Sequence, residues 1–145
     1  MPVNTKLVMT TSSLFLALAG IFALFTPDVL LTLLPVPFAN PLLGVPIANP
    51  LSVLIQLMGA LYFSMAMMNW TAKDSAIGGI YARPVSLANF AHFFIGTLLL
   101  AKYVLSSEFN VPILLILVVY AIFAILFYWL VFRATGLKVN NNTQR

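Results

Sequence analysis

The chain has 145 residues, of which 62% are apolar and only 7% are charged, and its formal net charge is +4. Soluble domains hold about 25% charged residues, so this composition excludes an ordinary soluble fold. The absence of cysteine excludes a disulfide framework, a thiolate metal site and a redox dithiol. One histidine is too few for a catalytic zinc or a bis-histidine haem, so we expect neither a metal nor a cofactor.

Long apolar segments dominate the chain. A helix of about 20 apolar residues crosses a bilayer core of roughly 30 Å, and four such segments follow one another here. The sequence therefore predicts an all-α membrane protein in a single domain: a four-transmembrane-helix bundle with a short interfacial helix after span one. The four spans are predicted at 7–25, 51–70, 84–105 and 112–132.

The first span admits a rival interpretation. Residues 17–19, Ala-Leu-Ala, resemble the small-residue cleavage site of a secretory signal peptide. The apolar run continues past this point to Phe25, which favours an uncleaved span.

A new helix start follows the first span. In Thr26-Pro27-Asp28, threonine can cap a helix, proline suits its first turn and aspartate favours the positive end of the helix dipole. The apolar segment from Val29 to Leu34 is too short to span, so we expect it to lie in the interface or across the bundle mouth.

A proline-rich outer connector covers residues 35–50. Ala39-Asn40-Pro41-Leu42 recurs as Ala48-Asn49-Pro50-Leu51, and in both copies Asn can cap a helix that has Pro in its first turn. The connector either folds onto the bundle as a lid or lies in the headgroups as a mobile loop. At the other end of the chain, the polar tail at about 136–145 is predicted to be disordered.

Basic residues are distributed unequally between the two ends of the spans. The amino end, the loop between spans two and three, and the tail together hold Lys6, Lys73, Arg83, Arg133, Lys138 and Arg145. The opposite side holds Lys102 alone. The positive-inside rule therefore places both termini in the cytoplasm. Cations scattered over span ends do not form a basic binding face, so we expect no nucleic-acid partner.

Two spans carry a polar or small-residue stripe. At about 100° per residue, one face of span three gathers Ser86, Asn89, His92, Phe93, Gly96 and Tyr103, and leaves out Ile95 and Leu98. A comparable stripe in span two holds Ser52, Gln56, Gly59, Phe63 and Ala66. Unpaired polar groups against lipid are costly, so both stripes should face protein. If spans two and three are antiparallel neighbours, Tyr62 lies near the level of His92, and Gly59 near Gly96.

The same depth estimate predicts a polar pocket in the cytoplasmic half of the bundle. Its candidate ligand-binding residues are His92, Asn89, Tyr62, Ser64, Tyr128 and Ser13, with Ser12 in the same layer. An ionisable residue at membrane depth is a functional hypothesis by default, and His92 titrates near neutral pH. The structural alternative is that His92 and Asn89 only hold helices together by interhelical hydrogen bonds.

The loop between spans two and three carries a second candidate contact. Arg83 and Lys73 are suited to an anionic lipid headgroup or a partner protein, and arginine can bind phosphate in a bidentate manner. The alternative is that these charges only set topology. Gly78-Gly79 lacks the preceding strand and the Gly-Lys-Ser/Thr ending of a phosphate-binding loop, and no paired carboxylates suit acid–base catalysis.

The order of these features resembles small bacterial four-helix membrane proteins of the DoxX-like type. The shared features are a first span followed by a Pro-Asp helix start, a small-residue second span, a basic inner loop and a third span after Arg83-Pro84. The similarity extends over about residues 7–132 and involves no catalytic motif. It implies a helical bundle in the bacterial inner membrane.

Three functions remain open from the sequence. The first is an accessory or scaffold protein, whose partners are the lipid bilayer and other membrane proteins or a homo-oligomer. The second is a binder of a lipid-like or quinone-like molecule in the pocket around His92. The third is a small proton-coupled carrier, although two inverted repeats are expected for many such folds and the Asn-Pro duplication is too short to count.

Overall fold

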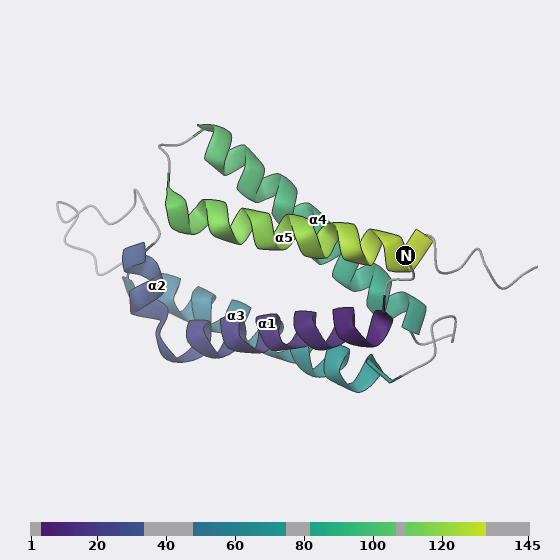
Figure 1. The fold of residues 1–145 in the computed structure, drawn as a ribbon. Helices are drawn as coiled ribbons and strands as arrows, with labels where there is room; N and C mark the ends of the chain where they lie inside the picture. The colour runs from purple at the N-terminus through teal and green to yellow at the C-terminus, as the bar shows by residue number, and fades with distance from the viewer. Residues whose placement is uncertain (1–3, 34–47, 75–81, 107–109, 133–145) are drawn as a thin grey trace, which may run out of the picture. The chain divides into compact units, whose positions relative to one another are not determined.

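A computed structural model describes residues 4–33, 48–74, 82–106 and 110–132 of the chain (Figure 1). Helices account for nearly all of these residues, and no strand occurs among them. The helices are α1 (Thr5–Phe25), α2 (Pro27–Leu33), α3 (Ala48–Ala72), α4 (Ala82–Ser106) and α5 (Val111–Phe132). Most of the proline-rich connector, the glycine pair at 78–79 and the polar tail lie outside the described residues, so the predictions made for them are not addressed.

Four of the helices are long and apolar enough to cross a membrane, as predicted. Their apolar segments cover Thr5–Phe25, Pro50–Ala72, Arg83–Ser106 and Val111–Phe132, with 21 to 24 residues each. Each helix begins one to three residues before the predicted span. Helices of this length and composition are typical of a multi-pass membrane protein.

Asparagine side chains cap two of the long helices. The Asn4 side-chain oxygen accepts a hydrogen bond from the Leu7 amide at 3.3 Å, and that of Asn110 accepts one from the Ile113 amide at 3.3 Å. These bonds satisfy amides that have no partner inside the helix. Neither cap was predicted, although Asn110 stands two residues before a proline in the first turn, which is a usual pattern for a helix start.

The break between α1 and α2 occurs at Thr26, as predicted. The Thr26 hydroxyl donates to the Phe22 carbonyl at 2.7 Å, so its side chain bonds back to α1, whereas we expected it to cap α2. Pro27 opens α2 and Asp28 lies in the first turn. With seven residues, α2 is too short to span, as expected.

The chain divides into two compact units. One comprises residues 11–70 and is called the α1–α3 unit; the other comprises residues 1–10 and 71–145 and is called the α4–α5 unit. Both units are built on a pair of long antiparallel helices (Figure 1). Each predicted stripe can therefore be compared with the helix that it contacts in its own unit.

In the α1–α3 unit, two glycines let the backbones of α1 and α3 approach closely. A Cβ atom added at Gly20 would lie 2.8 Å from the Gly59 carbonyl oxygen, and one added at Gly59 would lie 2.8 Å from the Gly20 carbonyl oxygen. A hydrogen is the only substituent that such a crossing accommodates. The close approach at Gly59 is therefore made to α1, and the expected proximity of Gly59 to Gly96 stays a prediction.

The predicted stripe of α3 faces α1 and α2 along its length. The Ser52 hydroxyl donates to an Asp28 carboxylate oxygen at 3.0 Å, and the Gln56 amide donates to the Leu24 carbonyl at 3.2 Å. Farther along α3, the Ala66 carbonyl accepts a hydrogen bond from α1. The stripe is therefore a helix-packing surface.

In the α4–α5 unit, aromatic rings fill the contact between the two helices. Phe93 is fully buried, and its ring lies 4.9 Å from that of Phe123 and 5.8 Å from that of Phe127, centroid to centroid. Ile95 and Leu98, which were predicted to lie off the stripe of span three, are each 55% exposed. The predicted orientation of α4 about its own axis is confirmed.

The glycine crossing leads to a first prediction. Gly59→Ala gains about 1 kcal/mol of helix propensity but places a methyl group against backbone atoms of α1, and overpacking of this kind costs about 1–3 kcal/mol. We expect a net loss of stability, measured by thermal unfolding in detergent. Ala60→Val adds bulk at the neighbouring, exposed position and should leave the transition nearly unchanged. Identical melting temperatures for Gly59→Ala and the unaltered protein would contradict the close crossing of α1 and α3.

Candidate functional site

Three buried polar side chains join α1 to α3. Ser12, Ser13 and Asn69 are 0%, 4% and 0% exposed. The Asn69 amide donates to the Ser12 hydroxyl oxygen at 3.2 Å, and the Ser13 hydroxyl donates to the Ala66 carbonyl at 2.7 Å. Interhelical hydrogen bonds of this type contribute about 0.6 kcal/mol each in a membrane. Ser13, predicted as a ligand-binding residue, therefore has an interhelical bond to α3.

Sequence reasoning did not include Asn69 in the site. Asn69 follows Ala66 by three residues, which continues the small and polar stripe of α3 by almost one turn. Extending the stripe to the end of the span would have found it.

The two site residues predicted on α3, Tyr62 and Ser64, are less buried than Asn69. Ser64 is exposed, and its hydroxyl donates to the Ala60 carbonyl of its own helix at 2.9 Å. Tyr62 is half-buried. Bonding of a serine hydroxyl to the preceding turn satisfies the hydroxyl without a second helix, so Ser64 needs no polar pocket.

On α4, Asn89 and His92 lie on the predicted inward stripe but have different partners. Asn89 is fully buried, and its amide donates to the Val85 carbonyl, 2.8 Å away in the same helix. His92 is half-buried, and its Nε2 lies 3.4 Å from the Tyr120 hydroxyl of α5. The two rings are tilted by 51°, with their centroids 5.6 Å apart.

Gly96 positions the tyrosine of this pair. A Cβ atom added at Gly96 would lie 2.6 Å from two carbons of the Tyr120 ring, so the ring rests directly on the α4 backbone. Tyr120 is only 6% exposed. The missing side chain at Gly96 thus allows the Tyr120 hydroxyl to reach the imidazole one turn earlier on α4.

Sequence reasoning predicted Tyr128, not Tyr120, as the tyrosine that α5 contributes to the site. Tyr128 is 48% exposed, and its ring lies 6.0 Å from Phe90 and 5.0 Å from Phe132. The difference arises from the register of the helices, because Phe93 packs against Phe123 and Phe127 and this brings the preceding turn of α5 to His92. The depth of a residue, when it is estimated from the ends of its span, is not accurate to the two helical turns that separate Tyr120 from Tyr128.

The six predicted residues are divided between the two units. Ser13, Tyr62 and Ser64 belong to the α1–α3 unit, and Asn89, His92 and Tyr128 belong to the α4–α5 unit. A pocket shared by all of them stays a prediction. Among the described residues, no group of three or more His, Cys, Asp or Glu side chains could hold a metal ion.

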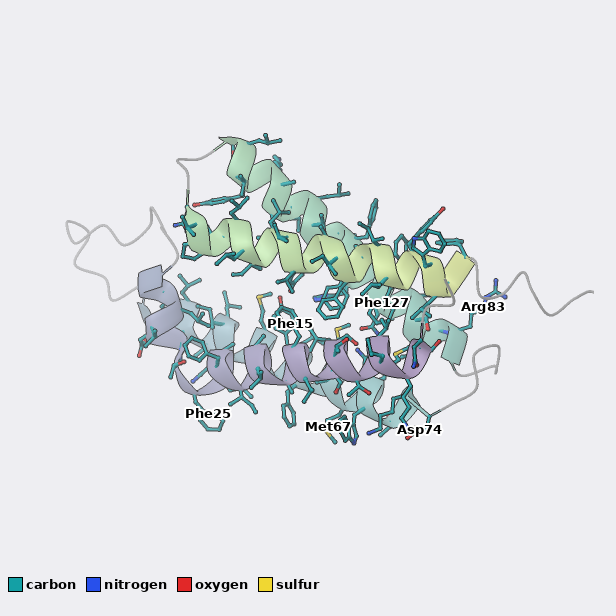
Figure 2. All side chains as sticks on the ribbon, in the orientation of Figure 1. Phe15, Phe25, Met67, Asp74, Arg83 and Phe127 are labelled. Carbon is teal, nitrogen blue, oxygen red and sulfur yellow. The ribbon has the colours of Figure 1, made fainter. Side chains whose placement is uncertain are left out.

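Charged groups gather at the start of α1 and just after α3. The Lys6 ammonium lies 2.8 Å from an Asp74 carboxylate oxygen, and both side chains are largely exposed. The hydrogen bond from Lys6 is the main cause that lowers the pKa of Asp74; the charges of Lys6 and Lys73 lower it further, against an opposing effect of desolvation. Arg83 is exposed at the start of α4; Figure 2 labels Arg83 and Asp74 separately.

Comparison with protein-family models, with curated proteins and with solved structures finds no match for this chain. The resemblance to DoxX-like proteins therefore stays a prediction.

The ion pair gives a second prediction. Because the pKa of Asp74 is lowered in the folded state, the pair is complete above the ordinary pKa of aspartate and is lost as the pH falls through the lowered value. Carbon-13 NMR of the Asp74 carboxyl in micelles should show that lowered midpoint, and Lys6→Gln should raise it. Lys102→Gln, which removes an exposed cation elsewhere, should leave it unchanged. An unaltered midpoint in Lys6→Gln would contradict the ion pair.

Proposed function

We propose that this chain is a multi-pass protein of the bacterial inner membrane, that both its termini are cytoplasmic, and that it acts as an accessory protein for other membrane proteins. Membrane insertion is supported by the length and hydropathy of the four long helices. The orientation is supported by the charge distribution, since six of the seven basic residues fall on one side of the predicted spans. The Lys6–Asp74 pair agrees with it, because it joins the start of α1 to the residues just after α3.

The accessory role is supported by the hydrogen-bond partners of the polar side chains in the spans. Ser13 and Asn69 bond between α1 and α3, and Asn89 bonds to its own helix. The Ser13 and Asn69 bonds hold a helix pair together, whereas the Asn89 bond lies within α4, so the structural interpretation is supported by the contacts of the α1–α3 unit.

The outward faces of the same helices are apolar. Large exposed side chains on them include Leu14, Leu18, Leu57, Leu61, Leu98 and Leu115. In a bilayer such faces contact acyl chains or the spans of another protein. Because acyl chains are as apolar as leucine, association with another span through these faces depends on side-chain packing and not on hydrophobicity.

Topology is the first test of the proposal. Reporter fusions at residue 1 and residue 145 should both show the cytoplasmic phenotype, and a reporter inserted in the 35–50 connector should show the opposite one. The physical reason is the excess of lysine and arginine on the side of both termini. Termini on opposite faces would overturn the four-span orientation.

A second candidate function is supported by the His92–Tyr120 pair. The Tyr120 hydroxyl and His92 Nε2 lie 3.4 Å apart beside the ring of Phe93; in the tautomer that protonates Nε2, the imidazole donates to the phenol oxygen and the phenol O–H is the donor to a carbonyl oxygen. A quinone-like molecule presents such a carbonyl on a flat apolar ring. This pair is therefore where a bound small molecule of that class would be oriented.

Native mass spectrometry of the protein extracted with its surrounding lipid decides between the two functions. The accessory role predicts a second protein at fixed stoichiometry, retained when Tyr120→Phe removes the hydroxyl. The ligand-binding role predicts a stoichiometric small molecule, lost both in Tyr120→Phe and in Gly96→Ala, where the added methyl group displaces the Tyr120 ring. Tyr128→Phe is the matched control, because Tyr128 packs against Phe90 and Phe132. Detection of neither a bound protein nor a bound small molecule would contradict both functions.

A further inference from the structure

Four aromatic rings form a continuous patch between the first half of α4 and the end of α5. Phe90 lies at its centre, with ring centroids 5.3 Å from Phe94, 6.0 Å from Tyr128 and 5.7 Å from Phe132. Phe94, Tyr128 and Phe132 are 45%, 48% and 55% exposed. The patch therefore lies on the outside of the α4–α5 pair, in contrast to the buried rings around Phe93.

Arg83 lies in line with this patch on α4. At 3.6 residues per turn, Arg83, Leu87, Phe90 and Phe94 fall within an arc of roughly 60° on one helix face. Leu87 is 49% exposed and lies between Arg83 and Phe90 along this helix face. The face thus carries a cation at its end, followed over about two turns by apolar and then aromatic side chains. We call it the Arg83 face; it comprises Arg83, Leu87, Phe90, Phe94, Tyr128 and Phe132.

The charge of Arg83 has no acidic counterpart in the helices that form this face. The sequences of α4 and α5 contain neither aspartate nor glutamate. Asp74, the acidic residue closest to Arg83 in the sequence, is ion-paired with Lys6. An anion that reaches the Arg83 face is therefore attracted by the guanidinium without competition from a carboxylate of α4 or α5.

We infer that the Arg83 face binds an anionic phospholipid, with its phosphate on Arg83 and its acyl chains along Leu87 and the four rings. A guanidinium matches the geometry of a phosphate and can bind it in a bidentate manner, and a cation next to the end of a span lies at headgroup depth. The aromatic patch supplies a rigid apolar surface directly above that depth. This inference rests on the membrane insertion proposed above.

Quenching of Trp129 by brominated lipid tests the site. Trp129 follows Tyr128 and is 36% exposed, and Trp70→Phe removes the only other tryptophan. The protein is placed in phosphatidylcholine vesicles containing a small, equal fraction of dibrominated phosphatidylglycerol or dibrominated phosphatidylcholine. One cation at an anionic headgroup contributes about 1 kcal/mol, which corresponds to about five-fold stronger quenching by the phosphatidylglycerol.

Matched variants distinguish binding at the Arg83 face from a general attraction of anionic lipid to a basic protein. Arg83→Gln should remove the preference, whereas Lys102→Gln, an exposed cation near the other end of α4, should retain it. Phe94→Ala should weaken it while the helical circular dichroism and the melting temperature stay as in the unaltered protein. A preference that persists in Arg83→Gln, or that Lys102→Gln abolishes equally, overturns the lipid site. Absence of quenching by either lipid would instead overturn membrane insertion, and with it the proposed function.

Discussion

The close crossing of α1 and α3 at Gly20 and Gly59 is the contact on which the α1–α3 unit depends. With the two backbones this near, short side chains are sufficient to bridge them, as the Ser13–Ala66 and Asn69–Ser12 hydrogen bonds do. A bulkier residue at the crossing would separate the helices and leave these polar atoms buried without partners, which is costly in an apolar environment. The glycines thus make the polar contacts possible.

In the α4–α5 unit a glycine again makes room for a close contact between two helices, but here an aromatic ring occupies the space. Gly96 removes a side chain from α4, and the Tyr120 ring occupies the space, while Phe93 packs against rings one and two turns farther along α5. Aromatic packing therefore sets the register of this pair. The His92–Tyr120 contact is a consequence of that register, which also turns Tyr128 to the outer aromatic patch.

The two aromatic groups of the α4–α5 unit have different roles because one is buried and the other is exposed. Around Phe93 the rings are buried and hold the two helices together. Around Phe90 they offer an outer surface that ends at the cation of Arg83, so they can take part in binding. Burial, and not residue type, separates the packing role of the inner rings from the lipid-binding role that we propose for the outer ones.

The sequence by itself determined the number of long helices, their approximate limits, the break at Thr26 and the inward faces of α3 and α4. These properties follow from local composition and from a periodicity of 3.6 residues, which depend on one helix at a time. Only the tertiary structure decided which side chains meet: Gly59 with Gly20, His92 with Tyr120, and Asn69 with Ser12. Partners depend on the axial register between helices, and a slide of one turn exchanges them without altering either helix's own pattern.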